Sequence, residues 1–236
     1  MSLSPKPRGV FIVFEGIDRA GKSTQLASLF KDLSKCGVPA FDTRFPNYDA
    51  PTGALLRSYI RGSGTAPTTK RATHLLFAAN RAECMPLIEA ALAQGMTVIC
   101  DRYAYSGIAY SVGLGESLQY CQSVEADLPA PDAVIYFKLP VADAVKRAGF
   151  GGDCHDIEAL QERIKETYER PDMKRAHQRW IEVDATLPVD SLALLVQAHV
   201  HNVIAFADRA PLRKLFVCEL GCGCTPDKQV IAEEAK

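Results

Sequence analysis

The segment GIDRAGKS at residues 16–23 constrains this chain more than any other part of its sequence. It has the spacing of a phosphate-binding loop: Gly, any four residues, Gly, Lys, and then Ser or Thr. The apolar run VFIVF precedes it at residues 10–14, and a stretch with leucines at helical spacing follows at residues 22–35. In that context the N–H groups of the loop and of the helix N-terminus point at phosphate oxygens. An ordinary glycine-containing turn is the weaker interpretation.

The rest of the chain alternates between short apolar runs and longer amphipathic runs. The predicted strands cover residues 10–14, 40–45, 97–100, 133–139 and 180–183. The predicted helices cover residues 22–35, 54–60, 71–94, 106–112, 116–127, 142–148, 157–169 and 190–208. Such alternation predicts an α/β fold with a five-stranded parallel sheet and helices on both faces, as in P-loop nucleotide kinases. Pro86 lies inside the third helix, where we expect a kink or a break.

We expect one kinase domain over residues 1–210 and a C-terminal tail over residues 211–236. The tail differs in composition and carries three of the eight cysteines, at positions 218, 222 and 224. Structural zinc usually takes four ligands, so we interpret these cysteines as free thiols on a flexible tail. His199 and His201 lie two positions apart on the last predicted helix and do not share a face, so both are predicted as surface residues.

Charge and hydropathy disfavour several classes of partner. The net charge is −1, so no overall field attracts the chain to nucleic acid or to a membrane surface. No apolar run approaches the roughly 18 residues that span a bilayer, and the N-terminus lacks the apolar core of a signal peptide. The cysteines are then expected to be reduced thiols, which predicts a cytoplasmic location, with a nuclear one left open.

The phosphate loop predicts the residues that handle a nucleoside triphosphate. Lys22 would reach the β- and γ-phosphates, and the Ser23 hydroxyl would bind Mg²⁺. Asp101 ends a buried strand and has the form of the acidic partner on the metal side. Because ligands bind beyond the carboxyl ends of parallel strands, Asp101 and Arg102 are expected beside the loop. The predicted cofactor is therefore Mg²⁺, held by Ser23 and Asp101.

Other basic residues suggest a second bound anion and a planar base. Arg19 lies inside the phosphate loop, and Arg44 ends the second predicted strand. Phe77 and Arg81 are four residues apart, so both face one side of a helix, where a ring and a guanidinium can bind a base. Core packing of Phe77 and surface exposure of Arg81 are the alternatives. No [NT]-K-x-D guanine motif occurs, so the pattern favours a kinase over a GTPase switch.

The longer motifs resemble those of the thymidylate kinase family, over roughly residues 8–208. They are FEGIDRAGKSTQ at 14–25, RFP at 44–46, LLFAANR at 75–81, DRYAYSG at 101–107 and LPAPD at 128–132. The resemblance implies transfer of the ATP γ-phosphate to dTMP. It implies a homodimer formed through the helices near residues 71–94 and 105–125. It also implies a mobile lid over residues 149–156 and a cis peptide bond between Phe45 and Pro46.

The resemblance further implies a role for each site residue. The catalytic residues would be Asp18, Arg19, Lys22 and Arg102. The ATP site would contain Gly16, Asp18, Arg19, Ala20, Gly21, Lys22, Ser23, Thr24 and Arg147. The acceptor site would contain Asp18, Arg44, Phe45, Pro46, Phe77, Arg81, Arg102, Ser106 and Tyr110. By this resemblance Asp18 holds the 3′-hydroxyl, Phe77 stacks on thymine, Arg81 donates to its carbonyl edge, and Arg102 grips the acceptor phosphate.

Two further implications concern charge. An acceptor that is already a phosphate anion needs no strong general base. The difficulty is to bring two polyanions together, and the lid sequence FGGDCHD has no Arg or Lys. Arg19 is therefore expected to stabilise the transferring group.

The chain departs from the family at two places. Many members carry an arginine shortly after RFP, where this chain has Asn47 and Tyr48, so Arg44 is expected to share the acceptor phosphate. His155 stands where relatives have a lid tyrosine. These changes leave dUMP open as an additional acceptor.

Two rival functions remain. A deoxynucleoside kinase would need a carboxylate base, for which Asp49 is the one candidate. A catalytically silent nucleotide-binding protein would be expected to lack Arg19, Lys22 or Ser23, and all three are present.

Overall fold

The computed structural model describes residues 7–62, 69–147, 155, 157–174 and 178–216. Its centre is a five-stranded sheet in the order β2-β3-β1-β4-β5, with every neighbouring pair parallel. The strands are β1 (Phe11–Glu15), β2 (Ala40–Arg44), β3 (Thr97–Asp101), β4 (Ala133–Lys138) and β5 (Trp180–Asp184). Every residue of β1 and β3 is buried, as expected for continuous apolar runs in a parallel sheet. The predicted fold class is confirmed.

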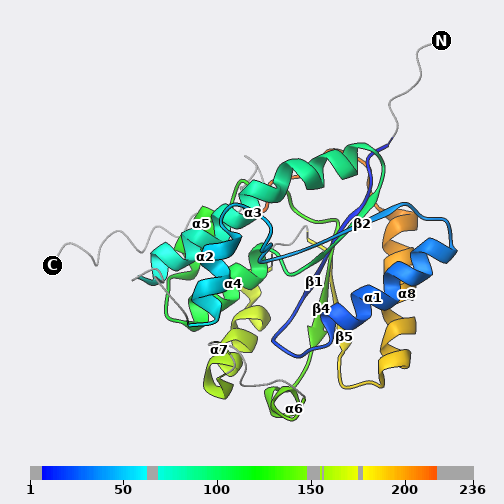
Figure 1. The fold of residues 1–236 in the computed structure, drawn as a ribbon. Coiled ribbons are helices and arrows are strands. Elements are labelled where there is room, and N and C mark those ends of the chain that lie inside the picture. Colours follow the sequence, from blue (N-terminus) through cyan, green and yellow to red (C-terminus); the bar gives the residue numbers. More distant parts are fainter. Residues whose placement is uncertain (1–6, 63–68, 148–154, 156, 175–177, 217–236) are drawn as a thin grey trace.

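Helices cover both faces of this sheet (Figure 1). On one side lie α1 (Lys22–Lys35) and α8 (Val189–Phe206), which pack against each other. On the other side lie the remaining larger helices (Figure 1). These are α2 (Gly53–Ile60), α3 (Lys70–Ala93), α4 (Ala104–Gly113), α5 (Leu118–Val124) and α7 (Glu158–Glu169). Two short elements, α6 (Val141–Val145) and the 3₁₀ turn η1 (Pro171–Met173), flank α7 in the chain.

The strand register sets the position of the phosphate loop. Phe14 of β1 lies opposite Asp101 of β3, and Asp101 lies opposite Arg44 of β2. Three strands therefore end at one level, and the segments that follow them emerge side by side. This confirms the expectation that Asp101 and Arg102 lie beside the loop that starts at Gly16.

Helix α3 tests part of the expectation of a kink or a break at Pro86. The helix runs without interruption from Lys70 to Ala93 with Pro86 inside it, so there is no break, and the kink stays a prediction. Proline removes one backbone hydrogen bond and crowds the preceding turn. Helix α3 packs against β3, α4, α5 and α2, and it buries residues on both sides of the proline, Arg81 and Ile88 among them. This packing stabilises the helix around Pro86.

Helix α8 corrects the expectation that no apolar stretch is long enough to span a bilayer. Its 18 residues have a mean hydropathy of 1.3, so by length and composition alone the helix could cross a membrane. The helix nevertheless buries Leu192, Val196, Val200 and Val203 at three- and four-residue spacing. This stripe packs in the core beside α1 and β5, as in an amphipathic helix that covers a sheet.

The first six residues of the predicted tail belong to the packed structure. The backbone N–H of Leu215 donates to the carbonyl of Leu128 at 2.9 Å, and the N–H of Ala130 donates to the carbonyl of Arg213 at 2.7 Å. Leu215 and Phe216 are both buried in the core. The three tail cysteines lie outside the described residues, as does most of the predicted lid, of which only His155 is described.

Candidate active site

Two cavities open at the carboxyl edge of the sheet and meet at shared residues. One has a volume of about 660 Å³ and is lined by the phosphate loop. The other has a volume of about 260 Å³ and lies among α2, α3 and α4. The residues that line both cavities are Asp18, Arg44, Phe45 and Arg102. Two ligands seated in these cavities would meet end to end at two arginines and a carboxylate.

The larger cavity gathers nearly all of the residues predicted to bind ATP. Its lining includes Asp18, Arg19, Ala20, Gly21, Lys22, Ser23, Thr24 and Arg147. Gly16 is not among the lining residues; it starts the loop, where a Cβ would come within 2.7 Å of the Phe137 carbonyl oxygen. Arg147 donates to the carbonyls of Arg19 and Ala185, each at 2.7 Å, and so ties the loop to the segment after β5. Sequence reasoning missed the far wall, which is made of Ala185, Leu187, Val189 and Leu192.

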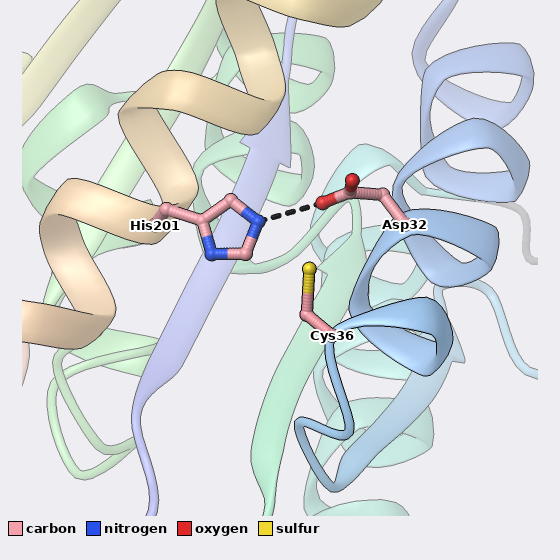
Figure 2. Close-up of side chains that lie close together, drawn as sticks. All are labelled: Asp32, Cys36 and His201. Carbon is pink, nitrogen blue, oxygen red and sulfur yellow. Dashed lines mark hydrogen bonds and ion pairs between the residues drawn. The ribbon is translucent and has the colours of Figure 1, made fainter.

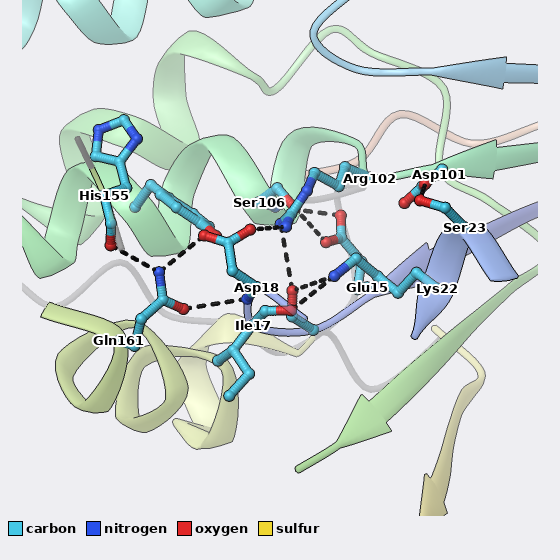
Figure 3. A network of polar contacts seen from close by, with 12 residues as sticks. Glu15, Ile17, Asp18, Lys22, Ser23, Asp101, Arg102, Ser106, His155 and Gln161 are labelled. Carbon is cyan, nitrogen blue, oxygen red and sulfur yellow. Dashed lines mark hydrogen bonds and ion pairs between the residues drawn. The ribbon is translucent and has the colours of Figure 1, made fainter. Parts of the chain in front are cut away.

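Lys22 is buried and folds back over the phosphate loop. Its Nζ donates to the carbonyls of Gly16 at 3.0 Å and Ile17 at 2.7 Å (Figure 3). Burial, together with the nearby Arg102 charge, lowers the pKa of Lys22 to about 8, although neighbouring carboxylates oppose this shift. The ammonium is thus desolvated and held at the position where a phosphate oxygen would complete its hydrogen bonds.

Ser23 and Asp101 form a candidate metal site. The Ser23 hydroxyl donates to Asp101 Oδ2 at 2.6 Å (Figure 3). Asp101 Oδ1 is buried and has no hydrogen-bond partner among the described residues. A buried carboxylate oxygen normally has a partner, and oxygen donors are the ligands that Mg²⁺ prefers. The Arg44 guanidinium lies 3.2 Å from the Ser23 hydroxyl and 3.4 Å from Asp101 Oδ2, so a positive charge already stands beside the pair. The donor atoms of the pair fit Mg²⁺, and the unpartnered Asp101 Oδ1 is the atom that would bind the ion.

The smaller cavity gathers every residue predicted for the acceptor site. These are Asp18, Arg44, Phe45, Pro46, Phe77, Arg81, Arg102, Ser106 and Tyr110. Aromatic rings form much of its wall: the Tyr59 ring lies edge-on to Phe77, with their centroids 6.0 Å apart, and His155 lies 5.4 Å from Tyr110. The Phe45–Pro46 peptide bond is cis, as predicted. A narrow, ring-lined cavity beside charged groups suits a planar base attached to an anion.

Arg81 is buried, which excludes the alternative of a surface charge. Its side chain is 2% exposed and forms a two-pronged ion pair with Glu125, which is fully buried. His74 lies beside the pair, with Nδ1 2.8 Å from the Ser111 hydroxyl and Nε2 3.7 Å from Glu125. Burial lowers the pKa of His74, so its neutral form is favoured. The guanidinium is thus held rigidly in the cavity wall.

Gly107 of α4 makes room for this arginine. A Cβ at Gly107 would lie 2.4 Å from an Arg81 guanidinium nitrogen. The glycine in the DRYAYSG motif is therefore required by the close approach of the ion pair. Glu125 was not found from the sequence, because no local spacing connects the end of α5 with Arg81. His74 was also missed, although it lies seven residues before Arg81 on α3 and therefore on the same helix face.

Asp18 connects the two cavities through hydrogen bonds and an ion pair (Figure 3). It accepts from the Tyr110 hydroxyl at 2.6 Å and from Gln161 Nε2 at 2.8 Å, and it pairs with Arg102. Burial alone would raise the pKa of Asp18, but the charges of Arg102 and Lys22 lower it overall, so the carboxylate is ionised. Gln161 was not predicted.

Glu15 is the buried anchor of the DRYAYSG segment. It accepts hydrogen bonds from the backbone N–H groups of Tyr103 and Ser106, at 2.8 and 3.1 Å. It also accepts from the hydroxyls of Ser106 at 2.6 Å and Tyr168 at 2.8 Å. Burial raises the pKa of Glu15. The signal was present in the sequence, since a carboxylate at the end of an otherwise apolar strand needs partners.

Asn47, one of the two departures after RFP, is bound to α3. Its backbone N–H donates to Asn80 Oδ1 at 2.7 Å, and Asn80 Nδ2 donates back to the Asn47 carbonyl at 2.8 Å. Tyr48 lines the smaller cavity, with the Arg57 guanidinium 4.7 Å from its ring centroid. Asp49, the candidate base of a deoxynucleoside kinase, is exposed and is not among the residues lining either cavity.

Comparisons with known proteins agree with this geometry. The family model described as "Thymidylate kinase" matches residues 14–194. A thymidylate kinase from Homo sapiens is 38% identical over 89% of this chain and 98% of its own length. One from Dictyostelium discoideum is 36% identical over 79% of this chain and 82% of its own length. The solved thymidylate kinase from Candida albicans superposes with a TM-score of 0.77 at 27% identity, over 89% of this chain and 99% of that one.

Proposed function

The chain belongs to the thymidylate kinase family, and on that premise we propose how it transfers the γ-phosphate of ATP to dTMP. The observation that carries the proposal is the meeting of the two cavities at Asp18, Arg44, Phe45 and Arg102. ATP occupies the larger cavity with its phosphates on the loop. The monophosphate occupies the smaller one with its base among the rings. The transferred group then passes between two sites that share a cationic border.

The chain's own residues supply charge and position. Arg19, Lys22 and Arg102 neutralise the phosphates, so that a charged donor and a charged acceptor can approach in line. When Mg²⁺ is bound by Ser23 and Asp101, it adds further neutralisation of the triphosphate. No general base is required, because the attacking oxygen belongs to a phosphate that is already ionised. Asp18 holds Arg102 and presents its carboxylate to the acceptor sugar.

The smaller cavity selects the acceptor by its base. Phe77 stacks on the base, and Arg81, held by Glu125, presents its guanidinium to a carbonyl edge. Thymine and uracil share that edge and differ only in a methyl group. One methyl group contributes only about 1–3 kcal/mol of discrimination in an apolar pocket. We therefore expect dTMP to be preferred and dUMP to be accepted more weakly.

A steady-state assay with Mg²⁺–ATP tests the activity. Purified protein is offered dTMP, dUMP and thymidine in parallel, and the nucleotide products are resolved by chromatography. The expected order of kcat/KM is dTMP above dUMP, with no turnover of thymidine. Turnover of thymidine alone would favour the deoxynucleoside kinase. ATP binding by calorimetry without any product would favour a silent nucleotide-binding protein.

We also propose that two copies associate through α3. Two large leucines on this helix are exposed in the isolated chain, Leu75 at 49% and Leu87 at 63%. Interfaces between identical chains are more apolar than the rest of a protein surface, so apolar side chains that the isolated chain exposes on α3 suit such an interface. A two-fold pair would bury the same helix from both copies, which is the commonest arrangement of soluble homo-oligomers.

A further inference from the structure

A cluster of three different donor atoms lies on the opposite side of the sheet from the acceptor cavity. Asp32 and Cys36 come from the C-terminal end of α1, and His201 comes from α8, which packs against it (Figure 2). One carboxylate oxygen, one thiol sulfur and one imidazole nitrogen all lie within 4.8 Å of one another. Figure 2 shows the three side chains converging from the two helices. None of these three residues has a role in the phosphoryl transfer proposed above.

Two packed helices are enough to bring the three residues together. Asp32 and Cys36 are four residues apart, so they lie on one face of α1, one turn above the other. His201 approaches from the facing helix, and its Nε2 lies 2.6 Å from Asp32 Oδ2. His201 is partly exposed, in keeping with the expectation of a surface residue, but that expectation gave it no partner. That expectation considered its own helix only, and the partners come from another one.

The chemistry of the donors indicates which ion would fit. A thiolate, an imidazole and a carboxylate are ligands of zinc and of neighbouring transition ions, whereas Mg²⁺ prefers oxygen alone. A zinc site that holds a water has three protein ligands and an open fourth position, whereas a purely structural zinc usually has four protein ligands. The cluster matches the first kind. The side chains of Asp32 and His201 are 27% and 38% exposed, and Cys36 is exposed, so water and ions can reach the cluster.

The surroundings favour a cation as well. Cys36 caps the C-terminus of α1, where the last carbonyls leave a partial negative charge. Lys35 stands in the same last turn and opposes the binding of a cation. Its exposed ammonium is screened by water and salt more than a ligand in direct contact would be.

We propose that Asp32, Cys36 and His201 bind one zinc ion, or a neighbouring transition ion, between α1 and α8, with the fourth position left to water. Binding releases the thiol proton of Cys36. It also requires an unprotonated His201 Nε2, so the proton on that nitrogen leaves or moves to Nδ1. The site is independent of the kinase reaction, because along α1 about 15 Å separates Asp32 from Lys22.

The test uses the full-length protein in which the three tail cysteines are replaced, as Cys218→Ser, Cys222→Ser and Cys224→Ser. This background removes the other thiols that are close together in the sequence. Cobalt is titrated into the metal-free protein, and the thiolate-to-cobalt charge-transfer absorption is followed. Zinc bound after dialysis is counted by mass spectrometry. The expected result is one ion per chain, with a cobalt absorption that zinc abolishes.

Two variants and a matched control assign the ligands. Cys36→Ser and His201→Ala should each abolish the absorption, whereas His199→Ala, two positions away on the same helix, should leave it intact. Zinc at about 100 times its Kd should raise the Tm by about 5–10 °C in the parent and not in Cys36→Ser. Loss of all binding when the tail cysteines are replaced, or an unchanged absorption in Cys36→Ser, would overturn the proposal.

Discussion

At the scale of single residues, the most specific prediction concerns the role of Arg19 in catalysis. It lies inside the phosphate loop with a positive φ of 62°, it is exposed, and it lines the larger cavity. Replacing it by alanine removes charge stabilisation of the transferring group. We expect kcat to fall by about 10³- to 10⁵-fold with an unchanged circular dichroism spectrum. Turnover near that of the parent protein would remove Arg19 from the mechanism.

We predict that ATP binding takes up a proton at high pH because of Lys22. Its pKa is lowered to about 8 by burial, and a bound polyphosphate would favour the charged form and raise that pKa again. Below this pKa the lysine is already charged, so ATP binding changes its protonation little. Above this pKa the lysine is mostly neutral, so ATP binding must take up a proton. At about one pH unit above the pKa, ATP binding should take up close to one proton.

Calorimetry in two buffers of different ionisation enthalpy measures this uptake. ATP itself is fully ionised at that pH and contributes nothing. The Lys22→Met variant serves as the control and should show no uptake, even if it binds more weakly. Equal binding enthalpies in both buffers for the parent protein would contradict the predicted pKa.

At the scale of elements, the Arg81–Glu125 ion pair joins α3 to α5. Glu125→Gln leaves a buried guanidinium without its counter-charge, so we expect a loss of about 3–5 kcal/mol in the free energy of unfolding. The double variant Arg81→Met with Glu125→Leu removes both charges and should recover most of that stability. The KM of the double variant for dTMP should nevertheless be higher than that of the parent protein, because the base loses the Arg81 guanidinium as its hydrogen-bond donor.

Urea unfolding and steady-state kinetics on the same three proteins separate the two roles. A purely structural pair would restore KM together with stability in the double variant. A pair that positions Arg81 for the base would restore stability alone. Recovery of both quantities would therefore remove Arg81 from base recognition.

At the scale of the whole molecule, the expected property is association through α3. Sedimentation equilibrium should give about twice the chain mass of 25.7 kDa. Leu87→Asp places a charge in the proposed interface and should shift the protein to a monomer. Leu194→Asp is a matched control, because Leu194 is 69% exposed on α8. A monomer in the parent protein, or equal effects of the two substitutions, would exclude this interface.

Much of the architecture could be predicted from local patterns. The phosphate loop, the strand that ends in Asp101 and the alternation of strands and helices each occupy contiguous residues. Strand periodicity and loop spacing are local properties, so they predicted a parallel sheet with Asp101 beside the loop. Residues that follow neighbouring strands were expected to lie together, and the shared border of the two cavities at Arg44 and Arg102 agrees with that expectation.

The sequence by itself determined the chemistry of the loop, because a few adjacent residues suffice to bind a phosphate. Only the tertiary structure decided which charges are buried and what pairs with them. Arg81 meets Glu125 across 44 positions, and His201 meets Asp32 across 169. No spacing rule connects such distant positions. A charge buried without a partner costs a large amount of free energy, so each buried charge needs a partner.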